Sequence, residues 1–162
     1  MYEFLLPTLE AIRNSAFAQW VASILGYQQA AETVHMTFFS VVVGSIVLLT
    51  LRLLGVSPRV PVDRLARLLF PAIWIGFAGL VISGSFMFAP RATRIARYQL
   101  FQLKLSLLIV VVISLVVIQF AVRRYAVTWE TQGVPVPIRV VAAGCLVLAP
   151  TVVVVARFMY VL

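Results

Sequence analysis

Charged residues are scarce in this chain: they make up 11% of its 162 residues, against about a quarter in soluble domains. Apolar residues make up 63%. A water-soluble fold of this size has too small an interior to bury that much apolar surface. The composition therefore excludes a soluble globular domain and indicates that lipid is the solvent.

Reactive side chains are equally few. The chain has one histidine, His35, one cysteine, Cys145, and one aspartate, Asp63. A single cysteine excludes an internal disulfide, and this set cannot build a familiar hydrolytic triad. The motifs G-x-x-x-x-G-K-[ST], H-E-x-x-H and C-x-x-C are missing from the sequence. The sequence therefore favours a non-catalytic protein over an enzyme.

Acidic residues are outnumbered, 5 against 13 basic ones, which gives a formal net charge of +8. Basic residues beside membrane spans contact lipid headgroups and set topology. No basic face interleaved with aromatic residues accompanies the charge, so we expect no nucleic-acid partner. The basic residues that lie between apolar runs are Arg59, Arg64, Arg67, Arg91, Arg94, Arg97, Arg123, Arg124 and Arg139.

Long apolar runs are what the chain has in abundance. About 20 helical residues cross the roughly 30 Å hydrocarbon core of a bilayer. Proline and glycine separate the runs, and the loops are short, so successive helices should be antiparallel neighbours. We predict a single all-α membrane domain, residues 1–162, built as a four-helix antiparallel bundle. The predicted spans are about 31–54, 65–88, 101–122 and 138–161.

Residues 8–27 show a different pattern, in which apolar residues recur at helical spacing and polar residues fall between them. This pattern predicts an amphipathic helix, interrupted near Asn14 and Ser15, that lies in the membrane interface or caps one end of the bundle. The apolar positions are Leu9, Ile12, Ala16, Trp20 and Ile24.

The second span carries small residues three and four positions apart, which should let another helix approach closely and make this span central. The third span is bulky on all sides and should face more lipid. The small residues are Ala72, Gly76, Gly79 and Ser83.

Glu32 and His35 stand at the start of the first span, where polar residues are costly and therefore informative. In an antiparallel bundle, the start of the first and third spans and the end of the second and fourth share one membrane face. We predict a polar pocket at that face and expect Glu32 to pair with Lys104 or Arg157. The candidate ligand-binding residues are Glu32, His35, Phe39, Lys104, Arg157 and Tyr160.

Three kinds of ligand are compatible with this pocket. Imidazole and thioether groups suit monovalent copper, with His35, Met36, Met87 and Met159 as candidate ligands. A haem would need a His–Met axial pair or sharing across a dimer, because the chain has one histidine. The third is a quinone or a lipid headgroup, held by the polar set with aromatic residues nearby.

A purely structural interpretation is also open. Lys104 and Arg157 lie near helix ends, where long basic side chains extend to the interface, and His35 can serve as a hydrogen-bonded packing residue. Under this interpretation the protein is a non-catalytic accessory or structural subunit of a larger membrane complex, or a homo-oligomer.

Four segments resemble an uncharacterised bacterial family of small four-helix membrane proteins, catalogued as a domain of unknown function. They are ETVHMTFFSVVVGSIVLLTLRLLG, SGSFMFAP, FQLK and ARFMY. The family pattern has Glu-Thr-x-His, Leu-Arg-Leu-Leu-Gly, Phe-x-x-Lys and Gly-Arg-x-x-x-Tyr, and here Ala156 replaces the last glycine. The layout is distantly similar to copper-resistance D-type membrane proteins. The resemblance implies fold and location, and little about function.

Basic residues also bear on orientation. Seven flank the side with the first and third loops, against six on the other side when Lys104 and Arg157 are included. Because basic residues favour the cytoplasm, we predict a bacterial inner-membrane protein with both termini, and the Glu32/His35 face, in the periplasm.

Overall fold

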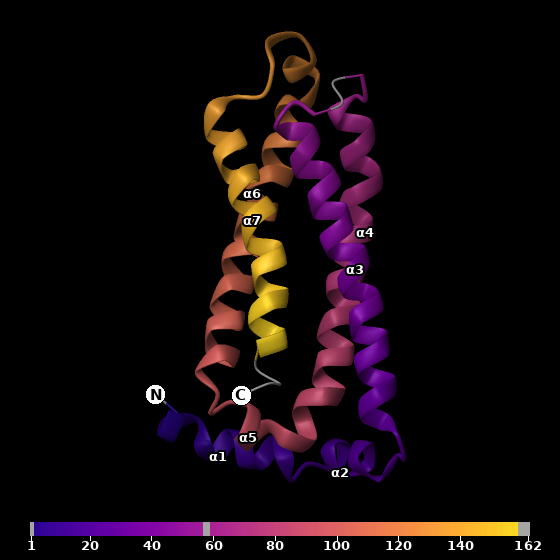
Figure 1. Cartoon of the computed structure of the whole chain (residues 1–162), viewed down its shortest axis with the longest axis vertical. Helices are drawn as coiled ribbons and strands as arrows, with labels where there is room; N and C mark the ends of the chain where they lie inside the picture. Colours follow the sequence, from indigo (N-terminus) through magenta and orange to yellow (C-terminus); the bar gives the residue numbers. More distant parts are fainter. Residues whose placement is uncertain (1, 57–58, 159–162) are drawn as a thin grey trace.

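The structure is helical throughout the residues it describes. This computed structural model describes residues 2–56 and 59–158 and contains no β-strand within them. Four helices, α3, α4, α6 and α7, are long and apolar enough to cross a membrane, so the predicted multi-pass helical membrane protein is confirmed. In chain order (Figure 1) the elements are α1 (Tyr2–Arg13), α2 (Ala16–Ser23), α3 (Tyr27–Leu53), α4 (Val62–Phe88), the 3-10 turn η1 (Ala89–Arg91), α5 (Ala92–Ile95), α6 (Gln99–Gln132) and α7 (Val136–Phe158).

Helix ends follow the punctuation in the sequence, with one correction. The third span was expected to end at residue 122, but α6 continues to Gln132. The segment after residue 122 contains no glycine or proline until Gly133, whose positive φ of 79° ends the helix while its N–H donates to the Trp129 carbonyl. Paired arginines at positions 123 and 124 thus mark where the apolar run stops, and the helix itself continues.

The small residues of α4 pack against α3. A Cβ atom at Gly79 would lie 2.5 Å from the Phe38 ring, and one at Gly76 would lie 2.5 Å from Val42 Cγ2. Only glycine leaves room for these contacts, which bring the two helices close together. In the most apolar stretch of α4, 39% of the residues are buried, against 22% for α6. The stretch in α4 is thus the most buried of the four, and the one in α6 is less buried, at the same 22% as in α7. That the second span is central stays a prediction.

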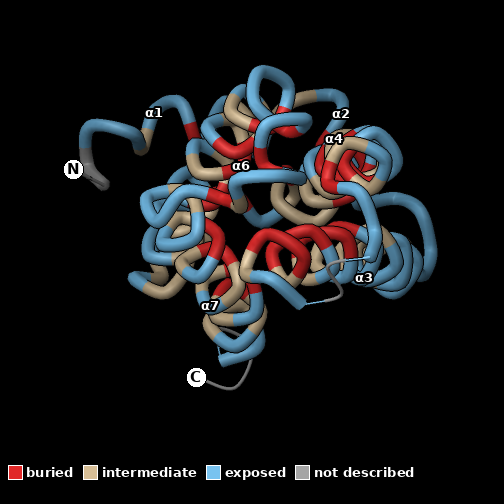
Figure 2. Tube along the Cα trace, turned by 90° about the horizontal axis from the view of Figure 1, so that it is seen from above, coloured by how far each residue is buried: buried red, intermediate tan, exposed pale blue. Residues whose placement is uncertain are grey.

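Each span has two neighbours, because α3 contacts α4 and α7, and α6 contacts α4 and α7. Viewed from above, the buried residues face the inside of this ring (Figure 2). Leu49, Ile73, Leu115 and Cys145, one from each span, are fully buried there. A hydrogen bond of 3.0 Å from Trp74 Nε1 to Gln119 Oε1 also joins α4 to α6.

One end of the bundle is closed by charge pairing, and we call it the paired end. Arg52 of α3 is buried and lies 3.4 Å from Glu130 Oε2 of α6. The Arg52 Nε group also donates to the Val60 carbonyl. Glu130 Oε1 accepts a 2.6 Å hydrogen bond from the Val62 N–H at the start of α4. The pair therefore ties three spans together.

The other end, which we call the pocket end, is covered by short helices. Figure 1 shows α1, α2 and α5 lying across the lower end of the spans, and α1 contacts α5 while α2 contacts η1. The expected break at Asn14 and Ser15 is present, and Ser15 caps α2 by accepting a 3.2 Å hydrogen bond from the Ala18 N–H. The site described next lies at this end of the bundle, and α5 contributes Ile95 to its wall.

Candidate functional site

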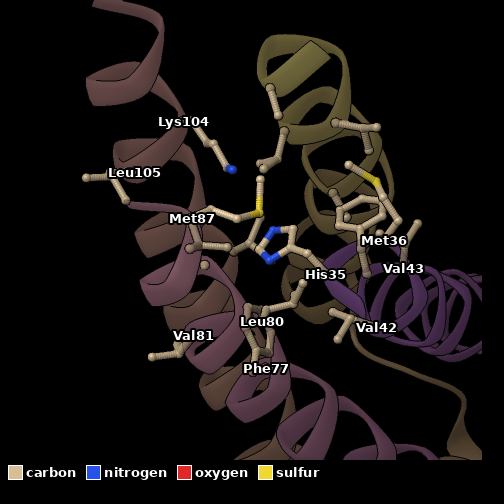
Figure 3. Close-up of a pocket in the computed structure, with 18 of the residues that line it drawn as sticks. His35, Met36, Val42, Val43, Phe77, Leu80, Val81, Met87, Lys104 and Leu105 are labelled. Carbon is tan, nitrogen blue, oxygen red and sulfur yellow. The ribbon is translucent and has the colours of Figure 1, made fainter. Parts of the chain in front are cut away.

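A cavity of about 610 Å³ lies between the spans at the pocket end, and we call it the pocket (Figure 3). All four spans contribute to its wall, together with Ile95 of α5. Along α3 the wall runs from Glu32 to Ile46, which corresponds to about 21 Å at 1.5 Å per residue. The pocket is therefore long in the direction of the spans.

Polarity changes along the pocket. Its charged side chains come from the second turns of α3 and α6 and the last turn of α7: Glu32, Lys104 and Arg157. The deep wall is apolar, formed by Ile46, Phe77, Val111, Ala149 and Val152. A molecule that matched this surface would have a polar head at the mouth and an apolar body inside.

His35 is fixed to α4 through Ser83. The His35 Nδ1 and Ser83 Oγ atoms are 2.9 Å apart, and the Ser83 hydroxyl donates to the Gly79 carbonyl at 2.6 Å. A serine hydroxyl has a single hydrogen, so Ser83 accepts from His35 when that hydrogen is donated to Gly79, and this assignment corresponds to the tautomer with the imidazole proton on Nδ1. The other ring nitrogen, Nε2, then presents a lone pair.

Lys104 extends from α6 into the pocket, toward the side of the wall formed by His35 and Met87 (Figure 3). It is half-buried. Among the residues that the structure describes, Lys104 has no ion-pair or hydrogen-bond partner. An ammonium group at this depth without a counter-charge is costly, and this makes Lys104 the most informative residue of the pocket.

The expected ion pair of Glu32 with Lys104 or Arg157 is not formed. Glu32, Lys104 and Arg157 all have described side chains, and none of them belongs to the ion pairs that the structure describes, Arg52–Glu130 and Asp63–Arg67. Glu32 projects from α3, whereas the two cations project from α6 and α7, and the pocket lies between these walls. The charges that the sequence suggested would meet therefore line one cavity without forming an ion pair.

The other predicted site residues divide into two groups. Met36, Phe39 and Met87 line the pocket with His35. Met159 and Tyr160 lie outside the described residues. In the described part of the chain no three side chains of the His, Cys, Asp or Glu types gather as a metal-binding group.

Aromatic residues at the mouth behave differently from one another. Phe101 lines the pocket and stacks on Phe88, with ring centroids 5.5 Å apart. Tyr98 is not part of the wall and accepts a 3.3 Å hydrogen bond from Arg94 Nε. Phe39 occupies the face of α3 one turn beyond His35, as the spacing predicted.

Sequence reasoning missed two features. Ser83 was interpreted only as a small packing residue, although its hydroxyl orients His35. The signal was present, because a hydroxyl side chain on a close-packed helix face can bond across to the neighbouring helix. The apolar depth of the pocket carries no sequence signature, since its residues are ordinary core residues.

The fold and the pocket define the class: a multi-pass helical membrane protein with a cavity open near one membrane face. Comparison with protein-family models, curated proteins and solved structures finds no match to the chain. The family resemblance noted above therefore stays a prediction, and the function has to be argued from the pocket.

Proposed function

We propose that this chain is a bacterial inner-membrane protein, an antiparallel four-helix bundle that binds a small organic molecule in its pocket without transforming it. The observation that carries this proposal is the pocket itself, about 610 Å³ with polar groups confined to one end. Ligand sites usually measure about 300–1,000 Å³, are mostly apolar and hold a few placed polar groups.

The donor set favours an organic ligand over copper or haem. His35 offers one imidazole nitrogen, since Nδ1 is held by Ser83. Met36 and Met87 add thioethers, which also serve as ordinary core filler. A copper site would therefore depend on Met159 in addition, and a haem site on a second axial ligand from outside the wall.

The short helices support an interfacial role for the N-terminal segment. Phe4, Trp20 and Leu25 are exposed, at 87%, 56% and 101%. Large apolar side chains exposed beside the ends of membrane spans suit the headgroup region, where tryptophan is favoured. With both termini in the periplasm, the pocket would open toward the outer leaflet.

The test is ligand retention by the full chain purified in mild detergent. Native mass spectrometry should find a bound small molecule on the wild type. Val153→Phe, which places a ring in the pocket, should lose it, and Val154→Phe should keep it because Val154 is exposed and not part of the wall. Copper that is retained stoichiometrically and lost in His35→Leu would replace this proposal with a metal site. An empty wild type that associates with other subunits would replace it with an accessory role.

A further inference from the structure

We infer that the ligand is an anionic single-chain amphiphile, with its headgroup at Lys104 and its alkyl chain along the deep apolar wall. This inference rests on the proposed function, because it names the chemical class of the molecule that the pocket binds. Two observations carry it: the shape and polarity of the pocket, and a cation inside it, Lys104, that has no partner among the described residues.

The shape argues for a chain. Along α4 the wall runs from Phe77 to Phe88, about 16 Å of helix, alongside the longer wall on α3. The cavity is therefore extended along the helices. Apolar residues of all four spans meet in its deep half, where an alkyl chain would find the same surroundings as in the bilayer. The chain would lie parallel to the lipid chains outside.

The charge argues for an anion. Lys104 is the only lysine of the chain, and its ammonium group enters the pocket. No described carboxylate lies within 4.0 Å of it, although Glu32 belongs to the same pocket. A neutral headgroup, such as a quinone carbonyl, would hydrogen-bond to Lys104 and leave its charge uncompensated. A carboxylate or phosphate would accept the hydrogen bond from Lys104 and also compensate its charge.

Neighbouring groups strengthen this preference. Arg157 lies at the mouth, one span away from Lys104, and it is exposed. Arg91 and Arg94 are also exposed on the elements that cover this end. Basic residues at an interface concentrate anionic lipids nearby. The pocket thus has several basic residues and the carboxylate of Glu32 around its entrance, one inner cation and an apolar interior.

Two kinds of molecule combine an anionic headgroup with a single alkyl chain: a free fatty acid, with its carboxylate, and a single-chain phospholipid, with its phosphate. The experiment uses the full chain in phosphatidylcholine nanodiscs and measures binding of three probes: palmitate, lysophosphatidylglycerol and hexadecanol. Hexadecanol has the chain and no charge. We expect one or both anionic probes to saturate a single site, and hexadecanol to bind more weakly. The anion that binds more tightly identifies which of the two kinds is the ligand.

Variants assign the effect to Lys104. Lys104→Gln should weaken binding of the anionic probes roughly 10- to 100-fold, because a charge-assisted hydrogen bond is lost. Lys104→Arg should retain most of the affinity. Arg123→Gln removes the same charge from an exposed position on α6 that is not part of the pocket wall, and it should change little. Hexadecanol should bind equally to the wild type and to Lys104→Gln.

Two failures are distinguishable. If hexadecanol binds the wild type as tightly as the anions, and Lys104→Gln changes no probe, the anionic class is wrong. In that case loss of all three probes in Val153→Phe would still support the pocket. If Val153→Phe binds every probe as the wild type does, the pocket is not the site, and the proposed function is wrong as well.

Discussion

The two ends of the bundle carry similar charged residues and use them differently. At the paired end, Arg52 is buried and contacts Glu130, whose carboxylate also accepts the Val62 N–H. At the pocket end, Lys104 and Glu32 face a cavity without contacting each other. The comparison teaches that a charged side chain near the end of a span has a structural role where the protein itself supplies its counter-charge and hydrogen-bond partners. Where the protein supplies no such partner, the charged side chain is available to bind a ligand.

Removing one partner at the paired end should have the largest effect. Glu130→Ala leaves the buried Arg52 guanidinium without its carboxylate and leaves the Val62 N–H without an acceptor. We expect a loss of about 3 kcal/mol in the free energy of unfolding, in line with broken buried pairs. Thermal unfolding in detergent measures it.

The matched control is Asp63→Asn, which removes a carboxylate from the exposed Asp63–Arg67 pair at the same end. Exposed pairs contribute little, so its unfolding temperature should stay near that of the wild type. Equal effects of the two substitutions would show that the Arg52–Glu130 contact is not what closes this end.

The next effect concerns the α3–α4 contact, which runs between the two ends. Gly79→Ala would bring a methyl group to within 2.5 Å of the Phe38 ring. Overpacking of this kind typically costs about 1–3 kcal/mol. The same unfolding assay should show Gly44→Ala to be neutral or slightly stabilising, because no atom lies within 4 Å of that site and alanine favours helix. If Gly79→Ala leaves the free energy of unfolding unchanged, α3 and α4 can move apart at this point without a loss of stability.

Much of the fold could be predicted from the sequence, because the physical signals are long and local. Apolar length gives the spans, and Gly55, Gly133 and the Ala89–Pro90 step mark their ends. The end of α6 was wrong because the prediction treated the loss of hydropathy as the end of the helix. That error also hid Glu130. The prediction placed it in a loop, whereas it lies on α6, eight residues beyond the end of the predicted span of 101–122.

The candidate site was predictable only in part. Alternation of span direction was enough to group Glu32, His35 and Lys104, which do line one pocket. It could not decide whether they touch, because pairing depends on the spacing of helices at ångström scale. The Ser83–His35 contact was beyond prediction for the same reason, since it joins residues 48 positions apart.

A smaller and opposite effect is expected for Lys104. Lys104→Met removes a charge that has no described partner and replaces it with an apolar side chain of similar length. In ligand-free protein the free energy of unfolding should stay unchanged or rise by about 1 kcal/mol, because a costly group is gone. Thermal unfolding of delipidated protein measures this change, with Lys104→Met and Glu130→Ala compared side by side. A destabilisation as large as that of Glu130→Ala would show that Lys104 is structural, and the contrast between the two ends would be lost.

The smallest effect concerns the proton on His35, and it can be observed directly because the chain has one histidine. The 2.9 Å contact with Ser83, whose hydroxyl hydrogen is used by Gly79, holds the proton on Nδ1. Nitrogen NMR of imidazole-labelled protein should therefore report the Nδ1–H tautomer. In Ser83→Ala the imidazole loses a hydrogen bond of about 1 kcal/mol, so the tautomer ratio should shift roughly fivefold toward Nε2–H.

Ser40→Ala is the control. The exposed Ser40 hydroxyl also donates within its own helix, to the Met36 carbonyl, and Ser40 is not part of the pocket wall. A wild type already dominated by Nε2–H would mean that Ser83 donates to His35. The lone pair would then face α4, and Nε2 would present an N–H group to the ligand.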